Sequence, residues 1–515
     1  MKNLSSRRAF LEGAGALVGG LALTHDASAS TVKPPLIARS PFGTTSSWIN
    51  EENARAGDGT WMRGPAAPAG SIEGYTNVTS VDLGRELSVF VSSVAPRVNA
   101  KIFRMGYYQG LGARLVETKN NVPAGAQVIP APDLFGTVDC QWPVSFTIDT
   151  SRHYPPGQYL IRLELSNGYY SFVPFVIRDD SSTATYAYMS AVTTWQAYNT
   201  WGGFSLYRGA DQLGVSGFNS AQRAVRVSFN RPYDRNFANG AADFVGNEFP
   251  LLFLAERHSL DLTYMTDVDL HERGSLLRRH RALLSLGHDE YYSPAMRTAV
   301  TDAVASGVNV AFFGANFVYR KIRFEDGTNG VNRLMVNYRS TADPIYSTDP
   351  SLATVNWSQW PSDLPESTFS GSRYGGVDGK GSLVVEDASS WLWRGTGLAN
   401  GDVLSNALGG EFNHYDPSSS NPTNVQILGH SPVGGGVSDV TYVAQPGQGG
   451  VFSTGTGQWI FHLSNSPRLG TSWVPGPLPG VTAQLTKATE NVFALFARGP
   501  AGSRMPSVSN VSLFY

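Results

Sequence analysis

The sequence predicts an α/β protein, in which an N-terminal β-sandwich domain is followed by a mostly parallel-sheet α/β domain. Two patterns and the composition predict this fold class. Short apolar runs separated by Gly and Pro fill residues 72–178, as is typical of a sandwich. Strand-like and helical runs alternate beyond residue 180, as they do in βαβ units. The 515-residue chain is 41% hydrophobic and 16% charged, which is a globular composition.

The first 29 residues are expected to be an export signal rather than part of the fold. Residues 6–11 read SRRAFL, a twin-arginine signature, and a short apolar stretch follows at 13–23. The small-x-small pattern ASA at 27–29 is the kind that signal peptidase cleaves. An arginine pair that happens to precede a short helix is the alternative. Because the apolar stretch is short for a bilayer, we expect an exported protein of the envelope or the exterior, with no membrane span.

Residues 30–180 are predicted to form the β-sandwich domain. A Pro-Pro-Gly sequence at 155–157 marks a turn within it. Its strand-like runs lie at 88–91, 98–103, 143–148, 159–163 and 172–177.

Residues 181–515 are predicted to form the α/β domain, with Gly- and Ser-rich insertions. Helical spacing covers 243–257, and a second helix is expected between the capping Ser293 and Gly307. A closing helix is expected at about 484–498. The expected strands are 187–192, 260–265, 283–286, 308–313, 440–444 and 451–452.

Charge and motifs exclude several classes of function. Lys and Arg number 39 against 41 Asp and Glu, so no overall charge favours a nucleic acid or an anionic membrane. The one cysteine, Cys140, rules out an intrachain disulfide and a thiolate zinc cluster. It also lies outside any strand–helix turn of the kind that a cysteine hydrolase needs. The serine-hydrolase elbow, the P-loop, the dinucleotide glycine motif and HExxH are absent.

Four predicted strands of the α/β domain run directly into polar clusters. The clusters lie at 194–199, 267–271, 287–292 and 314–316. Because an open parallel sheet binds ligands beyond the carboxyl ends of its strands, we expect the clusters to share one crevice. Phenol and carboxylate oxygens there would be hard ligands, suited to a highly charged cation.

Each cluster also has a purely structural interpretation. Carboxylates after His288 complement the dipole at a helix N-terminus. Tyr198 fits an aromatic core between two tryptophans. Asn316 is a residue type that tolerates a left-handed turn. Asp267 and Asp269 are typical of solvated loops.

Several longer motifs stand out in the same half of the chain. They are WQAYNTWGG at 195–203, SLY at 205–207, VSFNRPY at 227–233, TDVDLH at 266–271, GHDEYY at 287–292 and FFGAN at 312–316. Looser ones are FRMGYY at 103–108 and PGQY at 156–159. Together these motifs resemble those of the N,N-dimethylformamidase large (β) subunit family, over about residues 72–500.

The resemblance implies a glutamine-amidotransferase-like shape for the α/β domain and a mononuclear ferric iron centre. In such a centre two tyrosines and one glutamate hold the metal. On the matching motifs, Tyr198 and Glu290 are two of these ligands. Spacing favours Tyr159 as the second tyrosine, with Tyr207 and Tyr233 as rivals.

Three further residues gain expected catalytic roles from the resemblance. His288 would be an acid–base or supporting imidazole, Asn316 would orient substrate or water, and Glu411 would be a further carboxylate of the site. The expected activity is metal-assisted hydrolysis of a linear amide C–N bond in a small-molecule or envelope-derived substrate. A small subunit or a homo-oligomer is an expected partner, and nucleic acid is not.

Two other functions stay open at this point. One is a secreted carbohydrate- or envelope-binding protein whose site is not catalytic. The other is a metal-dependent hydrolase that acts on sugar or ester bonds.

Overall fold

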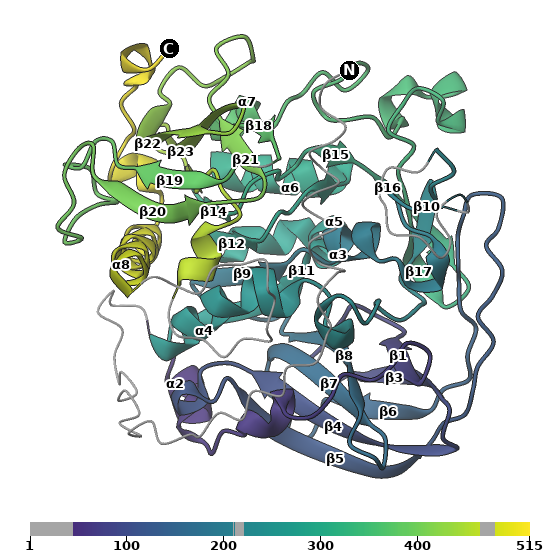
Figure 1. Cartoon of the computed structure of the whole chain (residues 1–515). Helices are drawn as coiled ribbons and strands as arrows, with labels where there is room; N and C mark the ends of the chain where they lie inside the picture. The colour runs from purple at the N-terminus through teal and green to yellow at the C-terminus, as the bar shows by residue number, and fades with distance from the viewer. Residues whose placement is uncertain (1–44, 210, 212–220, 378, 464–478) are drawn as a thin grey trace.

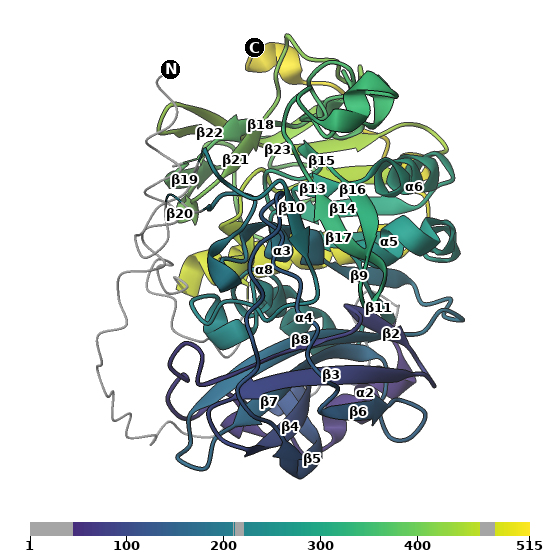
Figure 2. The ribbon, with the colours of Figure 1, turned by 90° about the vertical axis from the view of Figure 1, so that its right-hand side faces the viewer.

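The structure is a computed structural model that describes residues 45–209, 211, 221–377, 379–463 and 479–515 (Figure 1). The expected export signal lies outside these residues. The chain is a mixed α/β protein with several sheets, and its first strands, in purple and blue, lie below the rest in both views (Figures 1 and 2). In the described ranges no helix is long and apolar enough to cross a membrane.

Two sheets form the N-terminal part. The larger has the strand order β2-β8-β7-β4-β5, and all its pairs are antiparallel except β2 with β8. Its strands are β2 (Ser80–Asp82), β4 (Arg97–Met105), β5 (Ala113–Pro123), β7 (Gly157–Glu164) and β8 (Tyr170–Arg178). The smaller sheet is antiparallel, in the order β1-β3-β6. Its strands are β1 (Ile72–Thr76), β3 (Glu86–Ser93) and β6 (Phe146–Asp149).

The two N-terminal sheets share one hydrophobic core. Val89 of β3 and Ile161 of β7 are both fully buried in it. The strand predicted at 143–148 begins later than expected, at Phe146. Pro143 has no backbone N–H to donate to a neighbouring strand, which explains the later start.

A seven-stranded sheet lies in the middle of the molecule, and five neighbouring strands of it are parallel. The order is β11-β9-β12-β14-β24-β23-β22, with β23 and β22 antiparallel. The strands are β9 (Tyr186–Ser190), β11 (Leu262–Thr266), β12 (Ala282–Leu286), β14 (Asn309–Phe313), β22 (Gln426–Val433), β23 (Gly436–Ala444) and β24 (Gly450–Ser453). A mostly parallel sheet is therefore confirmed, and the four strands with polar ends are neighbours in it.

Helices cover both faces of this sheet. On β12, Leu284 faces a core that contains Phe249 of α4, whereas Leu283 faces a second core that contains Met296 of α6. The helices are α2 (Ser47–Ala54), α3 (Val192–Tyr198), α4 (Phe249–Arg257), α5 (Asp267–Arg273), α6 (Pro294–Ala305), α7 (Ser367–Ser370) and α8 (Pro479–Phe496).

Local sequence signals predicted the bounds of one helix correctly and those of another only in part. Helix α6 begins and ends as predicted, because Ser293 Oγ accepts the backbone N–H of Met296 and Gly307 follows with a φ of +94°. The helix predicted at 243–257 differs, since its first turn is a π-helix, η6 (Phe244–Glu248), before α4 starts.

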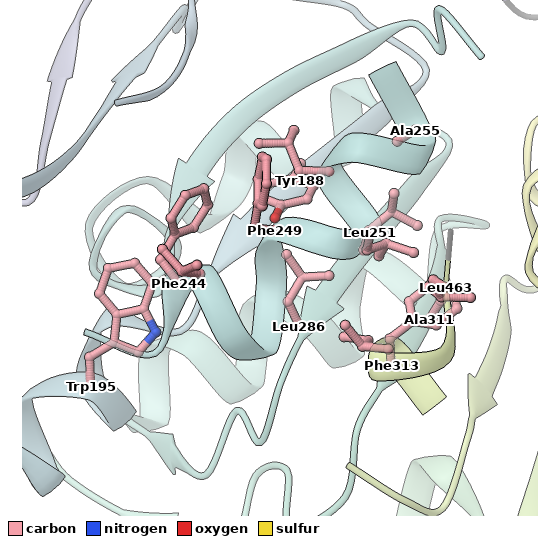
Figure 3. Close-up of a cluster of buried hydrophobic side chains, with 14 of the residues drawn as sticks. Tyr188, Trp195, Phe244, Phe249, Leu251, Ala255, Leu286, Ala311, Phe313 and Leu463 are labelled. Carbon is pink, nitrogen blue, oxygen red and sulfur yellow. The ribbon is translucent and has the colours of Figure 1, made fainter. Parts of the chain in front are cut away.

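The core beneath the polar strand ends is tightly packed. Phe249, Leu251 and Ala255 of α4 lie over Leu286 of β12 and Phe313 of β14, and all five are fully buried (Figure 3). Dense packing of this kind fixes the carboxyl ends of the two strands.

A buried ion pair links the N-terminal sheets to α4. Arg104 of β4 and Glu256 of α4 are fully buried, with Nη2–Oε1 and Nη1–Oε2 distances of 2.8 and 3.0 Å. The hydroxyl of Tyr264 and the side-chain amide of Asn53 also donate to Glu256. Buried charges persist where they are paired and hydrogen-bonded, so this network joins the two halves of the chain.

Smaller sheets complete the described chain. In the three-stranded one, β17 (Gly330–Val336) pairs with both β10 (Arg226–Ser228) and β16 (Arg323–Gly327). The two-stranded ones pair β13 (Tyr291–Tyr292) with β15 (Arg320–Lys321), β18 (Arg373–Gly376) with β21 (Phe412–His414), and β19 (Gly381–Val384) with β20 (Val403–Leu408). Strands β13 and β21 directly follow two of the predicted site residues, Glu290 and Glu411.

Candidate active site

Three of the four polar clusters come together. Tyr198 ends α3, which follows β9, while the segments 287–290 and 314–316 follow β12 and β14. Gly287 has a φ of +62°, and a Cβ on Gly314 would lie 1.6 Å from the Gly287 carbonyl oxygen. Only glycine permits this approach, which brings the loops after β12 and β14 into contact.

The side chains of Tyr198, Tyr207 and Glu290 form a group that we call the oxygen cluster. Tyr198 Oη lies 2.9 Å from Glu290 Oε2 and 2.8 Å from Tyr207 Oη. Tyr207 Oη lies 3.3 Å from each Glu290 carboxylate oxygen. The two phenol rings stack with their centroids 4.3 Å apart. All three residues are buried, and Glu290 completely so.

A third tyrosine and two arginines border the oxygen cluster. Tyr291 donates to Tyr207, with 2.7 Å between the hydroxyl oxygens. Arg339 donates to Tyr291 at 3.2 Å, and its guanidinium lies 4.0 Å from the centre of the Tyr207 ring. Arg320 Nε lies 3.3 Å from Glu290 Oε1. These cations offset the charge of the buried carboxylate.

Burial raises the pKa of two tyrosines at the site, Tyr198 and Tyr291. Burial, reinforced by the charge of Glu290, raises the pKa of Tyr198 well above its ordinary value. Burial and Glu290 likewise raise the pKa of Tyr291, although Arg339 opposes them. Such phenols lose their protons when a cation takes the proton's place.

His288, Asn316 and Glu411 lie beside the oxygen cluster. His288 Nε2 is 3.9 Å from Glu290 Oε2 and 4.0 Å from Glu411 Oε2. This nitrogen makes no hydrogen bond within the described part of the chain. Asn316 donates from Nδ2 to Glu411 Oε1 at 3.0 Å, and its own backbone N–H donates to Asn413 Oδ1 at 2.7 Å.

The site opens onto a pocket of about 930 Å³, a volume that includes its solvent-filled mouth. Tyr198, His288 and Glu411 line it. The rest of its lining is mainly apolar or glycine, namely Phe237, Ala238, Ala242, Gly246, Gly287, Ala315, Gly409, Gly410, Gly457 and Phe461, with Asn236, Asp243 and Asn247 as the polar exceptions. A mostly apolar pocket with a few convergent polar groups is typical of a small-molecule site.

Tyr159 lies away from the oxygen cluster, contrary to the expectation from spacing. It sits on β7 with its ring stacked on Phe175 at 5.0 Å, and its hydroxyl donates to the Pro155 carbonyl oxygen at 2.6 Å. The alternation of β7 turns this side chain into the core of the N-terminal sheets. Of the two other candidates for the second tyrosine ligand, Tyr207 belongs to the oxygen cluster, whereas Tyr233 packs edge-on against the ring of Trp195.

The fourth polar cluster, after β11, makes contacts that stabilise the fold. Asp269 and Thr266 form the capping box of α5. Asp267 accepts a backbone N–H of α3 at 3.0 Å, and His271 Nδ1 lies 2.7 Å from Ser293 Oγ. The interpretation of the two aspartates as solvated loop residues is therefore wrong, since both are buried in the first turn of α5.

The sequence patterns assigned no role to Tyr291, which lies in the cluster 287–292, and did not indicate Arg320 or Arg339. Tyr291 follows Glu290 directly, and that adjacency was the available signal. Arg339 lies 48 residues beyond Tyr291 in a segment without a motif, so only the fold brings the two together.

The donor set of the oxygen cluster suits a hard, highly charged cation. Neighbouring ligands of an octahedral ion with bonds of about 2.0 Å lie about 2.8 Å apart. The oxygen–oxygen distances here are 2.8 to 3.3 Å. In the described ranges, His, Cys, Asp and Glu alone form no group of three or more that could hold a metal, so a metal site here depends on the tyrosines.

The fold and the site define an α/β protein with a buried oxygen-donor site, set in a pocket at the carboxyl ends of parallel strands. The chain belongs to the N,N-dimethylformamidase beta subunit-like family. The family model described as "N,N-dimethylformamidase beta subunit-like, C-terminal" matches residues 99–470. The resemblance seen in the motifs is thereby confirmed.

One relative of known identity is the N,N-dimethylformamidase beta subunit of Paracoccus aminophilus. It is 21% identical over 413 residues, which cover 63% of this chain and 52% of the relative. The chain therefore spans about half the length of that relative.

Proposed function

We propose that this protein is an exported, iron-dependent hydrolase that cleaves amide-type C–N bonds. The observation that carries the proposal is the oxygen cluster, in which oxygens of Tyr198, Tyr207 and Glu290 lie within 3.3 Å of one another beside a pocket. Family membership supports an amide as the bond, because the Paracoccus relative is by name a formamidase. At 21% identity the substrate need not be shared, so we propose a small-molecule or envelope-derived linear amide.

Tyr198, Tyr207 and Glu290 are the residues that would hold the iron. When bound there, iron would act as a Lewis acid towards the amide carbonyl and a water molecule. Arg320 orients the carboxylate of Glu290 through its Nε–H. Tyr291 fixes the oxygen of Tyr207 by donating a hydrogen bond to it.

His288 is the group that we propose moves the proton. When an amide C–N bond breaks, the leaving nitrogen must gain a proton. His288 Nε2 lies about 4 Å from the carboxylates of Glu290 and Glu411, a separation that a water or a substrate atom can bridge. It also lines the pocket, so substrate can reach it.

Asn316 and Glu411 are proposed to orient the substrate or the attacking water. Asn316 fixes Glu411 through its Nδ2 donor. Its buried Oδ1 makes no hydrogen bond among the described residues, so this acceptor can take one from a ligand N–H or O–H.

Export, assembly and shape are also proposals. The twin-arginine sequence at 6–11 supports export. The relative is by name one subunit of its enzyme, which supports a small subunit or an oligomer here. The parallel sheet with its site at the carboxyl strand ends supports a glutamine-amidotransferase-like shape.

The test is amide cleavage by the purified chain with and without iron. Amine release from small linear formamides and acetamides is measured before chelation, after it, and after adding back iron, zinc or magnesium. We expect activity to be lost on chelation and restored by iron. His288→Ala should lower kcat/KM by about 100-fold. Tyr159→Phe is the matched control and should keep the activity.

Two results would contradict the proposal. One is cleavage that survives complete removal of iron, and the other is an iron-loaded protein that cleaves no amide in the panel. Cleavage of esters or glycosides instead would favour a metal hydrolase of another bond. Carbohydrate binding by an iron-free protein would favour the binding function.

A further inference from the structure

The charged groups on the wall of the active-site pocket are mainly acidic. Asp243 and Glu411 are the carboxylates of its lining, and His288 is the imidazole. In the described chain no lysine or arginine lines the pocket. The two arginines that border the oxygen cluster, Arg320 and Arg339, contact Glu290 and the bordering tyrosines.

Asp243 lies at a helix N-cap position, but its side chain does not cap the helix. It occupies the N-cap position of the π-helix η6, where an aspartate normally accepts a backbone N–H of the first turn. Here its side chain makes no capping hydrogen bond. By contrast, Thr266 and Ser293 do cap their helices.

The carboxylate of Asp243 faces the pocket instead. Within the described ranges it makes no hydrogen bond or salt bridge. Burial raises the pKa of this carboxyl group, and the charge of His288 opposes that rise. A half-buried carboxylate without a hydrogen bond or salt bridge is costly, and a cation in the pocket would reduce that cost.

The surroundings of Asp243 limit what that cation can be. Asn236 and Asn247 are the polar neighbours in the lining, while Phe237, Ala238 and Phe461 are apolar. A metal ion needs several oxygen ligands, whereas one carboxylate beside apolar walls suits an ammonium group on an aliphatic chain.

We infer that Asp243 is a specificity-determining residue that binds a protonated amine on the substrate. The substrate class is then a linear amide that also carries an aliphatic ammonium group, with the apolar wall contacting its methylene chain. This inference rests on the proposed function for the identity of the scissile bond, but the recognition of the cation does not depend on turnover.

The test compares two probes of the same shape. N-(4-aminobutyl)acetamide carries the ammonium group, and N-pentylacetamide replaces it with a methyl group. Their dissociation constants are measured by calorimetry with the full chain, the variants Asp243→Asn and Asp243→Glu, and the control Asp302→Asn. Asp302 lies on α6 with a side chain 53% exposed and is not part of the pocket lining, so its loss changes the net charge equally without changing the lining.

We expect the full chain to bind the ammonium probe about tenfold more tightly than the neutral one. The preference should disappear in Asp243→Asn and persist in Asp243→Glu and Asp302→Asn. Equal binding of the two probes by the full chain, failure of both probes to bind, or a preference that survives Asp243→Asn would overturn the inference.

Turnover separates this inference from the proposed function. If the ammonium preference depends on Asp243 but neither probe is cleaved by the iron-loaded protein, the hydrolase proposal fails and the recognition of a cation stands. If both probes are cleaved but bind equally, the hydrolase proposal stands and the role of Asp243 fails. Should Asp243→Asn not fold, Asp243→Ser provides the same charge removal.

Discussion

Asn316 has two roles that substitution can separate. Its backbone has a φ of +55°, in the left-handed region, and its side chain donates to Glu411. Asn316→Gly removes the amide and leaves a residue that adopts this φ freely. Asn316→Ala removes the same amide but places a Cβ on strained backbone.

The structure sets the size of each effect. The left-handed conformation costs an L-residue about 1 to 2 kcal/mol, so Asn316→Ala should be less stable than Asn316→Gly by about 1 kcal/mol. A hydrogen bond to a charged carboxylate contributes about 1.5 to 3 kcal/mol. If Glu411 must be oriented in the transition state, both variants should lose about 10- to 100-fold in kcat/KM.

Two assays distinguish these effects. Urea unfolding gives the free energy of unfolding of both variants, and amine release from the best amide substrate gives kcat/KM. We expect the variants to differ in stability and to match in activity. Wild-type kcat/KM in Asn316→Gly would refute the reasoning that the amide orients Glu411.

Other side chains give predictions of stability. Arg104→Met should lower the free energy of unfolding by about 3 to 5 kcal/mol in urea, because Glu256 would stay buried without its cation. The double variant Arg104→Met/Glu256→Leu should lower it by less, because no unpaired charge remains. A loss of under about 1 kcal/mol in Arg104→Met would contradict this reasoning. Asp439 raises the pKa of the His430 imidazole through a 2.8 Å hydrogen bond, so the protonated pair stabilises the fold at low pH and that stability is lost as pH rises through the raised pKa. His430→Asn should therefore cost about 1 kcal/mol at pH 5 and much less at pH 9, and a cost that does not change with pH would argue against the charged pair.

The scaffold was largely predictable because its signals are local. Runs such as 283–286 and 308–313 are apolar except for Ser285 and Asn309, as is typical of parallel strands buried on both faces. Ser293 and Gly307 define the limits of α6 by capping chemistry alone. The domain boundaries 30–180 and 181–515 stay predictions.

The site was predictable only in part, because its members meet through the fold. Tyr198, Glu290, His288 and Asn316 follow parallel strands, and that rule brings them together. Tyr207 does not follow a strand; it reaches Tyr198 after a turn at Gly202, whose φ is +76°. Spacing could not reveal that turn.

Tyr159 and Asp243 also show that sequence patterns do not decide where a side chain points. The first was expected at the site and lies in a core, whereas the second was not expected there and lines the pocket. Tyr159 lies in a motif, yet the alternation of β7 directs it into a core. Asp243 lies in what reads as an ordinary helix start, yet the π-helix leaves its carboxylate facing the pocket.

The most direct test of the account is the iron content and visible absorption of the purified protein and of two tyrosine variants. Phenolate bound to ferric iron absorbs visible light, so the full chain should be coloured and hold about one iron per chain. Tyr207→Phe should lose most of both, whereas Tyr159→Phe should keep them. A Tyr207→Phe variant with the iron content and absorption of the unaltered chain would contradict the central claim that the oxygen cluster holds the metal.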